Sequence, residues 1–354
     1  MFRFLIPTLF LSALVTPLPA QSDAESRDKL EKGINKALHF LKTKQRNDGS
    51  WLLFRNPSSA ATSLAVMSFL SAGHVPGEGP YADTVDKGIQ WVLKNQRNNG
   101  LLAGSSYQMY EHGISTLMLA EVYGMTDPKT ALKVKTALEK AVKIILQAQR
   151  TRGVHKGGWR YNITSPDADL SVTGWQLLAL RAAKNVGCDI PAERIDMAVN
   201  YVKRSYVARG KDGGAFRYTM GGNETIPCTG TGILCLELCE KHHTRQATSA
   251  GAYLVKKTNL PRMGGVHFFY NVYYGSQATF QLGGSNWEIY RPHLHDLLLK
   301  NQGQDGSWGG NSRGGGFTHY GPVYGTSMCV LALTVEYRFL PIYQRDDDSG
   351  KDKK

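Results

Sequence analysis

Two kinds of hydrophobic pattern alternate along the chain. In the first, apolar residues recur at helical spacing and leave a lysine-rich face, as in amphipathic helices at a protein surface. These stripes are formed by Leu30, Ile34, Leu38 and Leu41, by Val85, Ile89 and Val92, and by Ile195, Ala198 and Val202. The second kind is apolar or small nearly all round, over residues 61–73, 114–122, 175–183, 232–239 and 327–335. A helix without a polar face is typical of an interior position, so buried helices are predicted to alternate with surface helices.

Each surface helix, paired with the buried helix that follows it, predicts one of six helical hairpins. The predicted pairs are 24–46 with 59–73, 80–96 with 110–124, 128–149 with 169–187, 190–207 with 228–242, 245–258 with 270–282, and 286–301 with 322–339. We expect Pro292 to delay the start of the sixth surface helix or to kink it. The alternation predicts an all-α fold with an inner ring of buried helices and an outer ring of amphipathic ones.

A similar phrase recurs where the surface helices end. It occurs at 45–51 (QRNDGSW), 96–100 (QRNNG), 149–159 (QR, then GGW), 209–216 (RGKDGGAF, a degenerate copy) and 302–308 (QGQDGSW). A glycine after the last helical turn can adopt the left-handed conformation that ends a helix. The glutamine amide can satisfy loose carbonyls at the helix end, and the aromatic residue can pack on the neighbouring repeat. The phrase therefore predicts repeated turns in a closed, repetitive fold.

These phrases resemble the QW repeats of squalene cyclases and the repeats of protein prenyltransferase β-subunits, over residues 24–343. Residues 273–278 (YYGSQA) and 324–328 (YGTSM) look like the C-terminal repeat type of squalene cyclases, which occurs in many exported bacterial proteins. The resemblance implies a single (α/α)6 toroid of six helical hairpins in the terpenoid cyclase and prenyltransferase superfamily. It implies much less about activity, because one fold hosts many functions.

The two ends of the chain differ from the rest. Arg3 followed by an apolar run to Val15 and a small-residue end at Ala20 predicts a signal peptide over 1–20, with an uncleaved membrane anchor as the alternative. Residues 21–343 form the predicted toroid, and 344–354 form a charged tail expected to be disordered. The protein is therefore expected to be exported to the periplasm, the cell envelope or the medium.

Charge and composition limit the classes of binding partner that are expected. Hydrophobic residues make up 42% of the chain, which excludes global disorder. The net charge of +13 permits binding to acidic glycan or anionic lipid. Basic runs interleaved with aromatic residues are absent from the sequence, so nucleic acid is not an expected partner.

The resemblance also suggests a place for catalysis. Class II cyclases protonate their substrate with an aspartic acid in a D-x-D-D motif, and the nearest match is Asp167-Ala168-Asp169-Leu170 before the third buried helix. Asp169 would occupy the place of the proton donor, with Asp167 beside it, but Leu170 replaces the final carboxylate. Asp169 is equally suited to cap that helix. If the protein is an enzyme, an acid-initiated cyclase or isomerase is favoured over a zinc prenyltransferase.

Neither a metal nor a cofactor is expected. A zinc prenyltransferase uses Asp, Cys and His ligands, whereas this chain offers Glu224 and Cys228 at a different spacing, with His267 and His319 before later helices. The cysteines number five, and the simplest interpretation is buried small apolar residues rather than a disulfide framework.

Aromatic residues concentrate where the buried helices begin. The candidate ligand-binding residues are Tyr110, His112, Trp175, Phe269, Tyr270, Tyr273, Tyr274, Tyr320 and Tyr324, accompanied by Tyr107, Phe268, Phe317 and His319. In a ring these helix starts face a common mouth. Such a lining could shelter a carbocation, hold a polyprenyl chain or stack on sugars, and it could also simply fill the funnel.

These features are compatible with three alternative functions. The first is a cyclase-like protein that binds or transforms an isoprenoid lipid. The second is an extracytoplasmic enzyme acting on acidic polysaccharide, such as a lyase, with Tyr110, His112 and Arg160 as possible participants. The third is a non-catalytic binding or assembly module. The sequence leaves the oligomeric state open.

Overall fold

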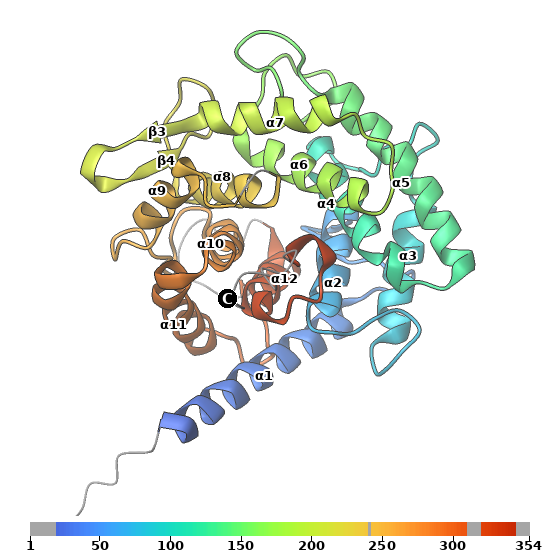
Figure 1. Cartoon of the computed structure of the whole chain (residues 1–354). Helices are drawn as coiled ribbons and strands as arrows, with labels where there is room; N and C mark the ends of the chain where they lie inside the picture. Colours follow the sequence, from blue (N-terminus) through green and yellow to red (C-terminus); the bar gives the residue numbers. More distant parts are fainter. Residues whose placement is uncertain (1–18, 240–241, 310–319, 345–354) are drawn as a thin grey trace, which may run out of the picture.

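The computed structural model describes residues 19–239, 242–309 and 320–344. Most of the predicted signal peptide and charged tail, together with Phe317 and His319, lies outside these residues. In the described part, twelve α-helices alternate between an outer and an inner ring (Figure 1). The outer helices are α1 (Pro19–Lys44), α3 (Ala82–Lys94), α5 (Pro128–Ala148), α7 (Ala192–Ser205), α9 (Arg245–Leu254) and α11 (Gly284–Lys300). The inner helices are α2 (Ser59–Ser71), α4 (Gln108–Val122), α6 (Leu170–Asn185), α8 (Ile226–Cys239), α10 (Phe268–Leu282) and α12 (Gly321–Leu333).

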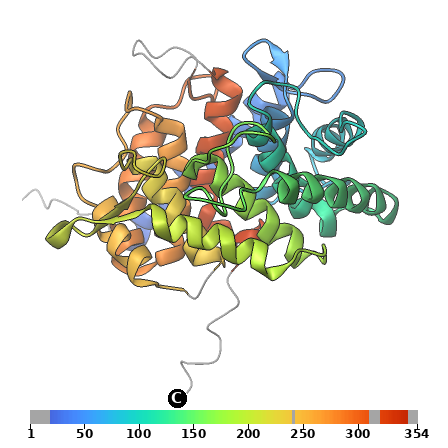
Figure 2. The same ribbon diagram turned by 90° about the horizontal axis from the view of Figure 1, so that it is seen from above.

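Each inner helix packs on the next one, and α12 packs back on α2, which closes the ring. This confirms the predicted (α/α)6 toroid. The remaining elements are short: the hairpins β1 (Leu52–Leu53) with β2 (Asn56–Pro57) and β3 (Tyr206–Ala208) with β4 (Gly214–Phe216), and the 3₁₀ turns η1 (Tyr123–Met125), η2 (Gly210–Asp212), η3 (Val335–Tyr337) and η4 (Pro341–Tyr343). We call the end where the inner helices begin the mouth and the opposite end the floor. In the side view, the β1–β2 hairpin projects at the mouth (Figure 2).

The predicted helix boundaries need three corrections. The sixth inner helix ends at Leu333 rather than at residue 339, and the 3₁₀ turn η3 follows it. The fifth outer helix ends at Leu254 rather than at residue 258, and a turn follows it. The sixth begins at Gly284 and continues through Pro292, so the expected late start is wrong. Among the described residues, no helix combines the length and the apolar character needed to cross a bilayer.

The glutamine of the recurring phrase joins neighbouring hairpins. Its side-chain amide donates to a carbonyl within its own phrase and to a carbonyl of the next outer helix. The pairs of acceptors are Gly49 and Thr84 for Gln45, Gly100 and Ala137 for Gln96, Gly157 and Arg194 for Gln149, and Gly306 and Gly33 for Gln302. The last pair connects the sixth hairpin to the first, so the same contact that links the repeats also closes the ring.

The aromatic residue of the phrase is fixed at both of its N–H groups. The Trp51 backbone N–H donates to Thr62 of the following inner helix (3.1 Å), and its indole donates to the Leu41 carbonyl of the preceding outer helix (2.7 Å). Trp159 and Trp308 make the same pair of bonds. Gly49 supplies the positive φ of 93° that this turn requires, and a Cβ there would lie 2.4 Å from the Lys87 carbonyl oxygen.

The floor is closed by the end of the described chain. The backbone N–H of Ile342 donates to the Glu121 carboxyl group at the end of α4 (3.2 Å). The Tyr343 hydroxyl bonds the Tyr273 hydroxyl, and Gln281 donates to the Tyr343 carbonyl (3.1 Å). Residues 341–343 therefore plug the ring at this end.

Candidate functional site

The loop between α5 and α6 places an aspartate at the mouth, where α6 begins. Asp169 is the N-cap of α6, and its side chain accepts from the Val172 backbone N–H (2.8 Å) and the Ser171 hydroxyl (2.6 Å). Its side chain has no exposed surface. The positive end of the helix dipole adds to these bonds in stabilising a carboxylate there. The capping role that the sequence suggested is confirmed.

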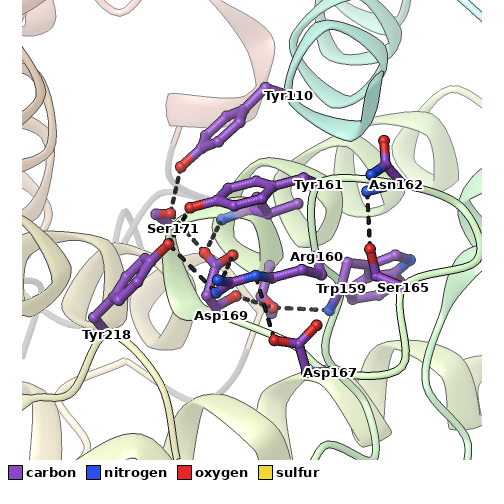
Figure 3. A network of polar contacts seen from close by, with 12 residues as sticks. Tyr110, Trp159, Arg160, Tyr161, Asn162, Ser165, Asp167, Asp169, Ser171 and Tyr218 are labelled. Atoms are coloured by element: carbon purple, nitrogen blue, oxygen red, sulfur yellow. Dashed lines mark hydrogen bonds and ion pairs between the residues drawn. The ribbon is translucent and has the colours of Figure 1, made fainter. Parts of the chain in front are cut away.

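Arg160 connects this aspartate to the rest of the mouth (Figure 3). Its Nη1 lies 3.2 Å from Asp169 Oδ2, and its Nε lies 3.4 Å from Asp167 Oδ2. The guanidinium also lies over the Tyr161 ring, 4.4 Å from the centroid, and donates to the Tyr218 hydroxyl (3.4 Å). One cation is thus held between two aspartates and two tyrosines, and the three charged groups sum to a formal charge of −1.

A chain of hydroxyl groups extends from this ion cluster. The Tyr161 and Tyr218 hydroxyls bond one another. The Tyr110 hydroxyl bonds the Ser171 hydroxyl, and the Tyr270 hydroxyl donates to the Ser171 carbonyl (2.9 Å). Residues from α4, α6, α10 and the loops before α6 and α8 therefore meet at one point, as the sticks of Figure 3 show for Tyr110, Ser171 and Tyr218.

Aromatic rings form the rim around these hydroxyls. Tyr107 is 57% exposed and packs edge-on against Tyr161, with 5.2 Å between the ring centroids. Tyr320 is 43% exposed and lies 5.1 Å from Tyr324 and 5.6 Å from Phe54, measured between ring centroids. The mouth thus presents aromatic faces to solvent around a core of polar groups.

Burial determines the protonation of the mouth. It raises the pKa of the Asp169 carboxyl above its ordinary value, while the bonds from Ser171 and Val172 and the charge of Arg160 act in the opposite direction. Burial also raises the pKa of the Tyr110, Tyr218 and Tyr270 hydroxyls, so these groups stay protonated at neutral pH. The hydroxyls are therefore suited to hydrogen bonding rather than to accepting a proton from a substrate as tyrosinates.

The structure does not place all of the predicted ligand-binding residues at the mouth. Trp175, Tyr273 and Tyr274 have at most 1% of their surface exposed, and Trp175 stacks on Tyr273 with 5.2 Å between centroids. They fill the interior of the ring between the mouth and the floor. Phe269 is also buried, against Tyr324 and α12. Tyr110, Tyr270, Tyr320 and Tyr324 remain as candidates that reach the mouth.

His112 needs a similar correction. Its Nδ1 accepts from the Leu102 backbone N–H (3.0 Å), and its Nε2 donates to the Ala141 carbonyl (2.9 Å). His112 thus has the role in the second hairpin that Thr62 has in the first. Thr62 accepts from the backbone N–H of Trp51, and His112 accepts from the backbone N–H of Leu102. Burial lowers the pKa of His112 to about 4, which keeps the ring neutral. Both ring nitrogens are engaged, so His112 supports the fold rather than contacting a ligand.

Two central residues, Tyr161 and Tyr218, were missed from the sequence because each lies in a loop outside the helical patterns. Arg160 was named only as one possible participant.

Within the described residues, no group of three His, Cys, Asp or Glu side chains has the arrangement of a metal site, and the five cysteines are free thiols. Glu224 pairs with Arg209 rather than with Cys228.

Comparison with known proteins gives the fold. The chain matches no family model. The α-1,6-mannanase GH76A of Salegentibacter sp. HEL1_6, in complex with α-1,6-mannotriose, has a TM-score of 0.64 at 12% identity, over 86% of this chain and 98% of that one. The type II terpene cyclase MstE from Scytonema has a TM-score of 0.55 at 16% identity, over 88% of this chain and all of that one. A D-mannose isomerase has a TM-score of 0.61 at 11% identity, over 87% and 97%. At these identities the likeness establishes the shared toroid and leaves the activity open.

Proposed function

We propose that this protein binds a neutral glycan at the mouth of the ring and does so without catalysing a reaction. The observation that carries the proposal is the composition of the mouth: among the described residues, the network at its surface consists of tyrosine rings, tyrosine hydroxyls, the edge of Arg160 and the half-exposed Asp167 carboxylate. Sugars present apolar ring faces and many hydroxyls, so aromatic platforms combined with hydrogen-bonding groups fit them.

The charge of the Arg160 cluster favours a neutral sugar over an acidic one. Arg160 is already paired with Asp167 and Asp169, so no net positive charge is left in this cluster to attract a uronate. A lyase acting on acidic polysaccharide would also need a base, and burial raises the pKa of Tyr110. His112 is bonded to backbone at both nitrogens. Tyr110, His112 and Arg160 are therefore unsuited to the catalytic roles that the lyase hypothesis gave them.

The state of Asp169 favours binding over acid catalysis. Both of its carboxyl oxygens are engaged, and its side chain is fully buried. A proton donor must reach the reacting atom of the substrate, which Asp169 does not do in this arrangement. We assign it instead as a positioning residue that orients Arg160 and Ser171.

An isoprenoid ligand is the second candidate. Burial raises the pKa of Asp169, the residue stands where the cyclase resemblance puts the proton donor, and the buried rings of Trp175, Tyr273 and Tyr274 lie deeper in the ring. A related terpene cyclase structure contains geranylgeranyl dihydroxybenzoate. These rings pack on one another, however, so an isoprenoid would have to displace them.

Calorimetric titration separates the two candidates. The mature chain is titrated with a panel of neutral oligosaccharides that begins with α-1,6-mannotriose, and separately with geranylgeraniol in detergent. We expect saturable binding of at least one oligosaccharide, weakened about tenfold by Arg160→Gln because the network loses its charge-assisted bonds. Binding of geranylgeraniol alone, lost in Trp175→Ala, would replace the glycan proposal with the isoprenoid one.

Export remains part of the proposal, because a glycan ligand outside the cell suits the leader predicted over residues 1–20. The test is fractionation of the source cells followed by N-terminal sequencing. A mature chain that begins near residue 21 in the envelope or medium supports export, and a full-length chain in the cytosol contradicts it.

A further inference from the structure

A concave surface lies on the outer wall of the ring and shares no lining residue with the mouth network. It is a shallow groove lined by Lys156 of the loop after α5 and by Met197, Asn200, Lys203 and Arg204 of α7. In Figure 1, α7 follows α5 around this part of the outer ring. Three of the five lining residues are basic, and none is acidic.

The groove is held in shape by backbone contacts. The Arg204 guanidinium donates to the Lys156 carbonyl (2.6 Å) and lies over the Tyr201 ring, 5.9 Å from its centroid. Gly157 approaches α7 so closely that a Cβ on it would lie 1.9 Å from the Met197 carbonyl oxygen. The loop and the helix are thus docked, and the cationic groups are placed together before any ligand arrives.

The charge of the groove differs from that of the mouth. Arg160 at the mouth has two carboxylate partners, whereas within the described residues neither Lys156 nor Arg204 is paired with a carboxylate. Lys203 has an interaction of its own, so Lys156 and Arg204 are the two cations assigned to the ligand. Asp196 lies on the same helix outside the groove. Arginine and lysine converging in a concavity fit the sulfate, phosphate or carboxylate groups of an anionic ligand.

We propose that this groove binds an acidic glycan through its sulfate or carboxylate groups, at a site separate from the mouth. The net charge of +13 makes a polyanion a favourable partner, and the groove gives that attraction a location that the Arg160 cluster, with its formal charge of −1, does not offer. Asn200 adds an amide that can bond the sugar hydroxyls. The inference is independent of whether the mouth binds a neutral glycan.

The test measures fluorescence polarisation of a labelled heparin hexasaccharide with the full mature chain. The groove variant carries Lys156→Glu and Arg204→Gln, the latter keeping a donor for the Lys156 carbonyl. The control variant carries Lys133→Glu and Lys140→Gln on the exposed face of α5, with the same change in net charge. We expect the groove variant to bind about tenfold more weakly than the control, since charges in direct contact contribute more than distant, screened ones.

Each other outcome overturns the proposal. An equal loss in both variants would mean a diffuse attraction with no site, and an unchanged affinity in the groove variant would mean the groove is not used. Vesicles of phosphatidylcholine with about one quarter phosphatidylglycerol form a second arm, and a groove effect seen only with vesicles would assign the surface to a membrane. Lys156→Glu alone repeats the test if the double variant is poorly folded. Arg160→Gln should leave heparin binding unchanged, which separates this site from the mouth.

Discussion

The two ends of the ring each hold a buried carboxyl group, and the surroundings treat the two groups in opposite ways. Asp169 at the mouth is at the start of α6 and accepts from Val172, Ser171 and Arg160. Glu121 at the floor is at the end of α4 and accepts from the backbone N–H of Ile342. The start of a helix stabilises a negative charge and the end of a helix opposes it.

This difference in surroundings distinguishes the polar site at the mouth from the structural contacts that close the floor. Burial raises the pKa of Glu121 to about 8, which leaves the group mostly protonated at neutral pH. Asp169 has a charged partner and two further donors that counteract its burial. The mouth can therefore hold fixed charge and exchange bonds with a ligand, whereas the floor joins α4, α10 and the last turn of the described chain.

The largest predicted effect concerns the pH dependence of stability caused by Glu121 at the floor. Because the pKa of Glu121 is higher folded than unfolded, the native state binds the extra proton, and stability is lost as pH rises from about 5 to about 8. Glu121→Gln removes this loss. Relative to wild type, the free energy of unfolding of the variant should rise by about 3 kcal/mol over that range, measured by urea titration. The exposed Glu139→Gln serves as control, and a difference that does not change with pH would refute a protonated Glu121.

The next effect concerns the mouth. Asp169→Ala removes the cap of α6 and one of the two carboxylate partners of Arg160, so it should lower the free energy of unfolding by about 2–3 kcal/mol at neutral pH. The half-exposed Asp167→Ala should cost less than about 1 kcal/mol. Equal losses in chemical denaturation would contradict the central place of Asp169.

A smaller effect is expected for Tyr343→Phe. The substitution leaves the buried Tyr273 hydroxyl without its partner and should cost about 1 kcal/mol in thermal or chemical denaturation. Glycan affinity should stay unchanged, because the contact lies at the floor. A change in affinity comparable to that of Arg160→Gln would mean that the two ends are coupled.

The smallest effect is expected for Tyr218→Phe. The lost hydroxyl lies in a partly exposed network, so stability should fall by about 0.5 kcal/mol. Glycan affinity should fall several-fold in calorimetry, the reverse of the pattern for Tyr343→Phe. Unaltered affinity would remove Tyr218 from the proposed site.

The sequence predicted the ring well because its signals are local. The amphipathic stripe of α3 and the apolar run of α12 follow from helical spacing alone. The recurring phrase carries its own turn glycine, as Gly49 and Gly306 show with φ values of 93° and 87°. The capping role of Asp169 was also readable, because a cap depends on residues within one helical turn.

The site was harder to predict because it is assembled across the ring. Tyr161 and Tyr218 bond one another from loops that precede different inner helices, and neither has a sequence pattern of its own. The sequence also does not show how far along an inner helix the mouth extends. Trp175 and Tyr273 were therefore predicted to line the ligand-binding mouth, although they fill the interior of the ring. His112 carried one usable signal: it occupies the place in its hairpin that threonine holds in the first, as Thr62 shows.

The most direct test of glycan binding at the mouth is hydrogen–deuterium exchange of the protein with and without the neutral oligosaccharide that binds best in calorimetry. We expect slower exchange in residues 158–172 and 216–220 at the mouth. Exchange should be unchanged in residues 118–122 and 340–344 at the floor. Protection confined to the floor, or no protection in the presence of any neutral oligosaccharide, would contradict the assignment of the mouth as the binding site.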